Sequence, residues 1–123
     1  MRFLPTRLHG AIDYLWGLAL LPAPWLLGFA DVTAAKWLAV VFGAGAILYS
    51  LVTDYELGAL RLLPMTLHLL LDGMGGAFLT LSPWLFGFAD RVYLPHLLFG
   101  LFSVAASLIT RTDPLPSGHR YSA

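Results

Sequence analysis

Histidine and aspartate recur at a helical spacing in two stretches of the chain that are otherwise apolar. The first set is His9, Asp13 and Gly17, and the second is His68, Asp72 and Gly76. Residues four apart lie on one face of an α-helix, so each histidine can reach the aspartate of its own set. The following glycine allows a neighbouring helix to approach closely. If the two stretches pack together, two imidazoles and two carboxylates meet in one place.

Three interpretations of these His/Asp pairs remain open. We favour hydrogen-bonded packing, because polar residues commonly join helices inside membranes and fix their register. Alternatively, His9, Asp13, His68 and Asp72 bind zinc, iron or manganese, whose preferred ligands are nitrogen and oxygen. The third interpretation is proton or ion movement, or a quinone or haem held between the two histidines. On the favoured interpretation no cofactor is expected, and a transition metal or haem is the alternative.

The composition excludes several classes of protein. Of the 123 residues, 59% are hydrophobic and 11% are charged, whereas soluble domains have about 25% charged residues. A globule of this size cannot bury so much apolar surface. Seven basic residues balance seven acidic ones, which argues against nucleic-acid binding. The absence of cysteine excludes disulfides and thiolate sites. No Ser/His/Asp triad or HExxH motif occurs, so we predict no catalytic residues and no enzyme.

Four apolar runs contain only two of the charged residues, Asp13 and Asp72. These runs are Leu8–Ala30, Trp37–Thr53, Leu62–Ala89 and Val92–Thr110. Each is close to the roughly 20 residues that cross a bilayer as a helix, which predicts four transmembrane helices. Prolines near the ends of two runs predict that the first and third helices stop near Leu21 and Leu81. Ser82 would then cap a short interfacial helix that begins at Pro83 and ends at Gly87.

The basic residues predict the orientation. Five arginines lie at the two termini and in the middle loop, whereas Lys36 and Arg91 lie on the other side. Both termini are therefore expected on the cytoplasmic side of the membrane, which for a bacterial protein would be the inner membrane. We predict a flexible cytoplasmic tail over residues 111–123, rich in Pro, Ser and Gly.

The two halves of the chain are repeats of one unit. Residues 5–31 align without a gap to residues 64–90, and 13 of these 27 positions are identical. The second helices align at a shift of 57, which pairs Gly43 with Gly100 and Thr53 with Thr110. Repeat 1 thus spans 5–54 and repeat 2 spans 64–110, within one domain over residues 1–110. We predict an all-α, four-helix transmembrane bundle of two parallel hairpins, with a pseudo-two-fold axis along the membrane normal.

The repeated motif makes a family resemblance visible. It consists of Gly17, Pro24, Trp25 and Gly28 in the first copy, and Gly76, Ser82, Pro83, Trp84 and Gly87 in the second. This pattern resembles the SPW-repeat family of small bacterial membrane proteins, in which Ser-Pro-Trp lies in the first of two transmembrane helices. The first copy departs from it, with alanine at position 23. The resemblance implies the topology and leaves the activity open.

For the function, we predict a non-enzymatic structural or accessory subunit that packs against itself or a larger membrane complex. Its partners would be the lipid bilayer and other membrane subunits, with no nucleic acid. The alternatives are a metal- or cofactor-binding protein that uses the paired His/Asp residues, and a small oligomeric carrier.

Overall fold

The computed structural model describes residues 2–113, which form five helices and no strand. The helices are α1 (Thr6–Leu20), α2 (Ala23–Leu26), α3 (Thr33–Leu51), α4 (Met65–Leu85) and α5 (Leu94–Ile109). The all-α prediction is confirmed, and the short α2 adds to the four long helices. The predicted tail lies outside the described residues from position 114 onward. Its first residue, Arg111, donates its backbone N–H to the carbonyl of Leu4 at 2.9 Å.

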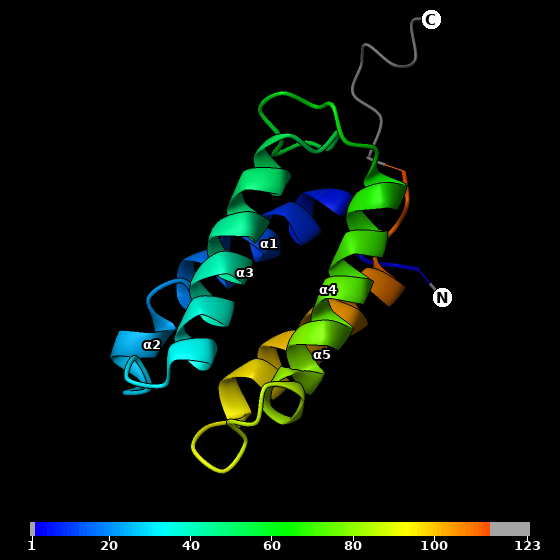
Figure 1. Cartoon of the computed structure of the whole chain (residues 1–123). Helices are drawn as coiled ribbons and strands as arrows, with labels where there is room; N and C mark the ends of the chain where they lie inside the picture. Colours follow the sequence, from blue (N-terminus) through cyan, green and yellow to red (C-terminus); the bar gives the residue numbers. More distant parts are fainter. Residues whose placement is uncertain (1, 114–123) are drawn as a thin grey trace, which may run out of the picture.

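The long helices pair in chain order, α1 with α3 and α4 with α5 (Figure 1). Glycines stand where the backbones of each pair approach most closely. A Cβ on Gly17 would lie 2.8 Å from the carbonyl oxygen of Gly43. In the second pair, a Cβ on Gly76 would lie 2.7 Å from the carbonyl oxygen of Gly100. Each repeat is therefore a hairpin whose helices touch through backbone atoms, a contact that only glycine permits.

The first helix ends where proline predicts, but the third does not. α1 ends at Leu20, whereas α4 continues through Pro83 to Leu85, so the predicted end near Leu81 is wrong. Proline leaves the carbonyl four residues before it without its helical N–H donor, here the carbonyl of Leu79. The Ser82 hydroxyl donates to that carbonyl at 2.7 Å, in place of the predicted capping role. In the first copy, alanine at position 23 offers no hydroxyl and an extra proline, Pro22, precedes it, and α1 ends at Leu20.

This contact makes Ser82→Ala a test of the serine in the motif. We expect the variant to lower the free energy of unfolding in detergent by about 1–2 kcal/mol, because the carbonyl of Leu79 loses the hydroxyl donor that stands in for the N–H missing at Pro83. Ser107→Ala is the matched control. The Ser107 hydroxyl also donates to the carbonyl three residues earlier, at 2.7 Å, but no proline lies beside it. Equal losses in the two variants would contradict this account of Ser82.

The first helical segment of each repeat ends in the same reversal of chain direction. Gly28 and Gly87 have φ angles of 78° and 73°, which residues with a side chain rarely adopt. The next residue, Phe29 or Phe88, donates its N–H back to the carbonyl of Pro24 or Pro83 at 2.8 Å. Both phenylalanines are buried. Gly87 therefore ends a helix as predicted, although that helix is α4 itself.

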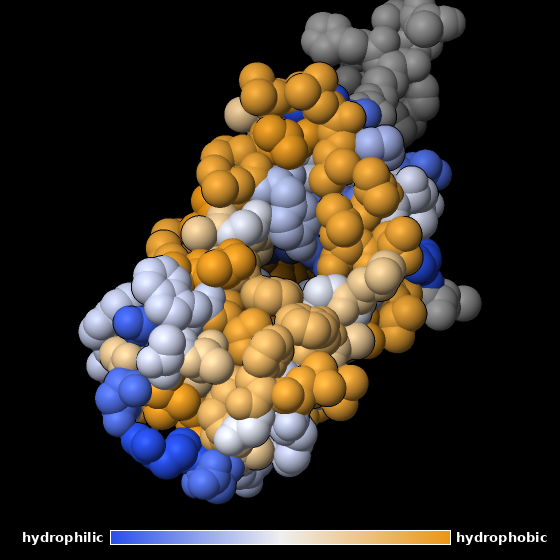
Figure 2. Space-filling model, viewed as in Figure 1, coloured by the Kyte–Doolittle hydropathy of each residue, from blue (hydrophilic) through white to orange (hydrophobic). Residues whose placement is uncertain are grey.

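Apolar side chains cover much of the outer surface. Figure 2 shows hydrophobic residues over the middle of the molecule and hydrophilic ones at the end formed by the α2–α3 and α4–α5 loops. There, Arg91 forms an ion pair with Asp31 at 2.6 Å. Within residues 2–113, α3 alone combines the length and the apolar composition needed to cross a membrane, and α5 is apolar but shorter.

Candidate metal centre

The two His/Asp pairs meet in one buried cluster between the repeats. His9, Asp13, His68 and Asp72 each offer one ligand atom, and these four atoms lie within 4.8 Å of one another. The histidine side chains are 1% and 0% exposed, and the aspartates 11% and 5%. The four residues lie on α1 and α4, one or two turns after the start of each helix. The structure thus brings together all four residues that the sequence singled out.

The contacts in the cluster are reciprocal between the repeats. His9 Nε2 lies 2.8 Å from Asp72 Oδ2, and His68 Nε2 lies 2.9 Å from Asp13 Oδ2. Each histidine also lies near the aspartate of its own helix, at 3.0 Å in α1 and 3.2 Å in α4. The backbone shows the same exchange, since one isolated β-bridge joins Leu4 to Thr110 and another joins Leu63 to Thr53. The cluster therefore depends on both repeats equally.

Two threonines determine which imidazole nitrogen carries the proton. Nδ1 of His68 lies 2.7 Å from the Thr53 hydroxyl, and Nδ1 of His9 lies 2.7 Å from the Thr110 hydroxyl. Each hydroxyl donates its proton to the backbone carbonyl four residues before it, at 2.6 Å for Thr53 and 2.5 Å for Thr110. A hydroxyl has only one proton, so its oxygen must accept from the histidine. Nδ1 is thus protonated in both rings.

Two tyrosines, one in the first repeat and one directly after it, hold the carboxylates. Tyr49 donates to Asp72 Oδ1, and Tyr55 donates to Asp13 Oδ2 at 2.9 Å. Tyr55 lies in the loop after α3, where its burial, and then the charge of Asp13, raise the pKa of its phenol above the ordinary value. Its hydroxyl therefore stays a neutral donor. Because Tyr49 occupies Oδ1 of Asp72, the other oxygen, Oδ2, faces the histidines.

The second nitrogen of each ring, Nε2, faces the carboxylates. Nε2 of His9 is hydrogen-bonded to Asp72 Oδ2 at 2.8 Å, and an Nε2 presents a lone pair to a carboxylate only where its imidazole is neutral. Nε2 of His68 is buried and makes no hydrogen bond, although an oxygen of Asp13 lies 2.9 Å away and one of Asp72 3.2 Å away. Two buried carboxylates and two neutral imidazoles carry a charge of −2, which is costly in an apolar interior. A divalent cation between them would neutralise that charge and turn both lone pairs into ligands.

The chain matches one family model, that of the SPW repeat domain, over residues 7–110. The chain belongs to the SPW repeat family. No curated protein and no solved structure is similar enough to this SPW repeat protein to match it. The Ser-Pro-Trp motif and the His/Asp cluster lie at different places on α4, because Ser82 and Asp72 are ten residues or about 15 Å apart along a helix. The motif shapes the helix end, and its residues form no part of the cluster.

Sequence reasoning missed four residues around the cluster, namely Tyr49, Thr53, Tyr55 and Thr110. A signal for the threonines was present, since the repeat alignment pairs Thr53 with Thr110 just as it pairs the two histidines. No such signal exists for the tyrosines. At the same shift of 57, the counterparts of Tyr49 and Tyr55 are Ala106 and Thr112.

Proposed function

We propose that this SPW repeat protein is a metal-binding membrane protein whose two repeats together hold one divalent transition-metal ion. The observation that carries the proposal is the convergence of two imidazole nitrogens and two carboxylate oxygens, all within 4.8 Å of one another, in a buried site. The threonine contacts hold both histidines at Nδ1, so that both Nε2 atoms point at the two carboxylates and are available to one cation between them. A metal-binding histidine usually donates its other ring N–H to an acceptor that fixes the ring, as both histidines do here to threonine.

The donor set favours some ions over others. Two imidazole nitrogens and two carboxylate oxygens suit zinc, iron(II) or manganese(II), and lack the soft sulfur ligands that copper(I) and iron–sulfur clusters require. Zinc lies about 2.0–2.2 Å from such atoms and takes four of them in structural sites. A cavity of about 20 Å³ beside His9, Asp13 and Asp72 has room for one water molecule. A water could complete the coordination there.

We further propose that α1, α3, α4 and α5 span the membrane as two parallel hairpins related by a pseudo-two-fold axis along the membrane normal. The reciprocal contacts of the cluster support the two-fold relation, since exchange of partners is its signature. The 21 residues of α4 extend about 31 Å, close to the thickness of the hydrocarbon core. The excess of arginine at the termini and in the middle loop favours a cytoplasmic location for both termini.

The non-enzymatic accessory subunit stays a prediction from the sequence. Apolar residues on the outer surface, such as Leu15, Leu18 and Leu48, are more than half exposed. Such residues suit contact with lipid and with a partner subunit equally, so they do not favour an accessory role. The cluster is the feature that distinguishes this protein from a plain bundle.

Metal binding is tested on the full chain purified in mild detergent. We expect elemental analysis to find about one zinc, iron or manganese ion per chain. After chelation, titration with Co²⁺ should give the visible absorption of a four- or five-coordinate site, saturating at one equivalent. In Asp72→Asn the affinity should fall at least about 100-fold, because losing a ligand costs more than the roughly 10–100-fold loss caused by removing a ligand's partner.

Asp90→Asn is the matched control, an aspartate of the same repeat that is exposed at the loop end. It should bind Co²⁺ as the unaltered protein does. A protein that takes up no Co²⁺ after chelation, or an Asp72→Asn variant with unchanged affinity, would overturn the proposal.

A further inference from the structure

A groove of about 350 Å³ runs along the outer surface between α4 and α5. At the end of the bundle where α4 begins and α5 stops, it is lined by polar side chains, namely those of Arg2, Thr66 and Thr112. Further along, its walls are apolar and include Leu70, Met74 and Leu108, which are all more than half exposed. From Thr66 to Met74 the groove follows α4 for eight residues, or about 12 Å. It is therefore polar at one end and apolar along its length.

In the first repeat, the corresponding groove between α1 and α3 is filled by the loop that follows α3. A Cβ on Gly10, the counterpart of Leu69 at a shift of 59, would lie 3.0 Å from Leu57 of this loop. Tyr14, the counterpart of Gly73, donates its hydroxyl to the carbonyl of Leu57 at 2.8 Å. Leu69 and Gly73 both line the α4/α5 groove, which residues 2–113 leave open. The same place in the fold is thus covered by the chain in one repeat and uncovered in the other.

An arginine stands at the same position in both repeats, but its contacts differ. Arg61 is the counterpart of Arg2 at a shift of 59, and its guanidinium donates to two carbonyls of the loop that fills its groove. Nη1 of Arg2 instead donates to the carbonyls of Ser107 and Thr110, at 2.6 and 2.8 Å. A guanidinium has five N–H donors. Since the bonds that Arg2 makes within residues 2–113 use Nη1 alone, Nε and Nη2 can donate to a ligand in the groove.

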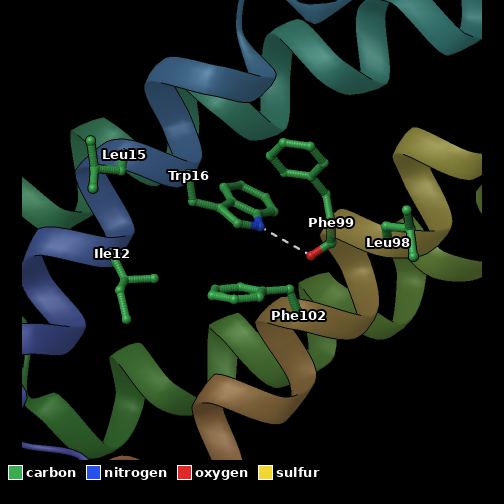
Figure 3. A pocket seen from close by; sticks show the side chains of 6 residues that line it. All are labelled: Ile12, Leu15, Trp16, Leu98, Phe99 and Phe102. Carbon is green, nitrogen blue, oxygen red and sulfur yellow. Dashed lines mark hydrogen bonds between the residues drawn. The ribbon is translucent and has the colours of Figure 1, made fainter.

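Two larger surface grooves lack this combination of free positive charge and apolar wall. The groove of about 410 Å³ between α1 and α5 is lined by Ile12, Leu15, Trp16, Leu98, Phe99 and Phe102. As Figure 3 shows, the indole N–H of Trp16 already donates to the carbonyl of Phe99, at 3.0 Å. The groove of about 530 Å³ at the loop end contains Arg91, but Arg91 forms an ion pair with Asp31, and Asp90 lines the same groove. No acidic residue lines the α4/α5 groove.

We infer that the α4/α5 groove binds an anionic phospholipid, with an acyl chain along its apolar walls and the phosphate at Arg2. This rests on the proposed function for the membrane-spanning arrangement, and not for the metal. In that arrangement Arg2 lies at the cytoplasmic face, where basic pockets between helices bind anionic head groups. Guanidinium and phosphate form paired, charge-assisted hydrogen bonds. Because no acidic residue of the groove offsets the charge of Arg2, a lipid with a net negative charge is favoured over a zwitterionic one.

Native mass spectrometry of the full chain in detergent tests the site. The protein is titrated separately with phosphatidylglycerol and phosphatidylcholine that carry the same acyl chains. We expect one molecule of phosphatidylglycerol to bind at least about fivefold more tightly than phosphatidylcholine, the effect of one basic residue near anionic lipid. Arg2→Gln should abolish this preference. Gly73→Tyr, which copies Tyr14 of the first repeat, should weaken the binding of both lipids at least about tenfold, because its ring fills the groove.

Two matched controls should bind both lipids as the unaltered protein does. Arg91→Gln removes an arginine at the loop end, and Gly45→Tyr adds the same ring at a helical glycine whose Cβ would meet no atom within 4 Å. Equal binding of the two lipids, a preference that Arg2→Gln retains, or equal losses in Gly73→Tyr and Gly45→Tyr would overturn the lipid site.

Two further measurements separate this proposal from its alternatives. Displacement of phosphatidylglycerol by an equal concentration of inorganic phosphate would mean that the site binds free phosphate, and would overturn the lipid. The unfolding midpoint shows whether each variant is folded, and if Arg2→Gln does not fold, then Gly73→Tyr decides. A protein that binds phosphatidylglycerol selectively but takes up no Co²⁺ would keep the lipid site and overturn the metal, and the converse result would do the opposite.

Discussion

Chelation is expected to lower the thermal stability of the unaltered protein and to leave the Asp13→Asn/Asp72→Asn double variant unchanged. A ligand that binds only the folded state at 1,000 times its Kd stabilises that state by about 4 kcal/mol. When the ion is removed, two carboxylates and two Nε2 lone pairs face one another at 2.8–3.2 Å. The measurement is the unfolding midpoint in detergent, with and without a chelator of divalent metals.

The double variant should also be more stable than the metal-free unaltered protein. An asparagine amide has N–H donors, so it can donate to the Nε2 of a neutral imidazole, whereas a carboxylate can only accept and bonds Nε2 only when the imidazole is charged. The cluster would then carry no net charge and need no cation. This result distinguishes a metal site from hydrogen-bonded packing. If the aspartates only join helices, the double variant is the less stable protein and the chelator has no effect on either.

Asp31→Asn/Asp90→Asn is the matched control for this comparison. These two aspartates are also related by the repeat, but they lie exposed at the loop end of the bundle. Their replacement should leave the effect of the chelator at its full size. A chelator effect that this control also loses would mean that the ion binds at the loop end.

The repeat made the position of the cluster predictable. Once His9–Asp13 and His68–Asp72 are recognised as copies on the first helix of each hairpin, a two-fold packing that turns these polar faces into the bundle brings them together at the axis. The glycine spacing likewise predicted where helices approach, and Gly17 and Gly76 make those contacts. Local patterns sufficed in these cases because the repeated sequence supplies the long-range relation that a single helix lacks.

What the sequence did not reveal depends on contacts between distant segments. Proton placement on the histidines depends on Thr110, which is 101 residues from His9. From the sequence alone, packing was the favoured interpretation, since polar residues commonly join helices and nothing showed whether the two His/Asp stripes face each other. The length of α4 was mispredicted for a local reason: proline was weighed as a helix breaker, whereas the preceding serine hydroxyl bonds the carbonyl that loses its donor.

Gly76→Ala and Gly45→Ala are expected to have opposite effects on stability, although both place one methyl group in the middle of a long helix. In Gly76→Ala the new Cβ would lie 2.7 Å from the carbonyl oxygen of Gly100 and 2.9 Å from the Ser103 Cβ. A backbone carbonyl in a helix cannot rotate away, so α4 and α5 must separate. Overpacking of this kind costs about 1–3 kcal/mol, and we expect the upper end or more because the obstruction is backbone.

In Gly45→Ala the Cβ meets no atom within 4 Å, so the variant only loses the flexibility of glycine in the unfolded chain. We expect its free energy of unfolding to rise by about 0.5–1 kcal/mol. Unfolding of both variants in the same detergent checks the pair, and Gly17→Ala, the counterpart of Gly76→Ala in the first hairpin, should share its loss. If Gly45→Ala is destabilised as much as Gly76→Ala, then Gly45 is a packing residue.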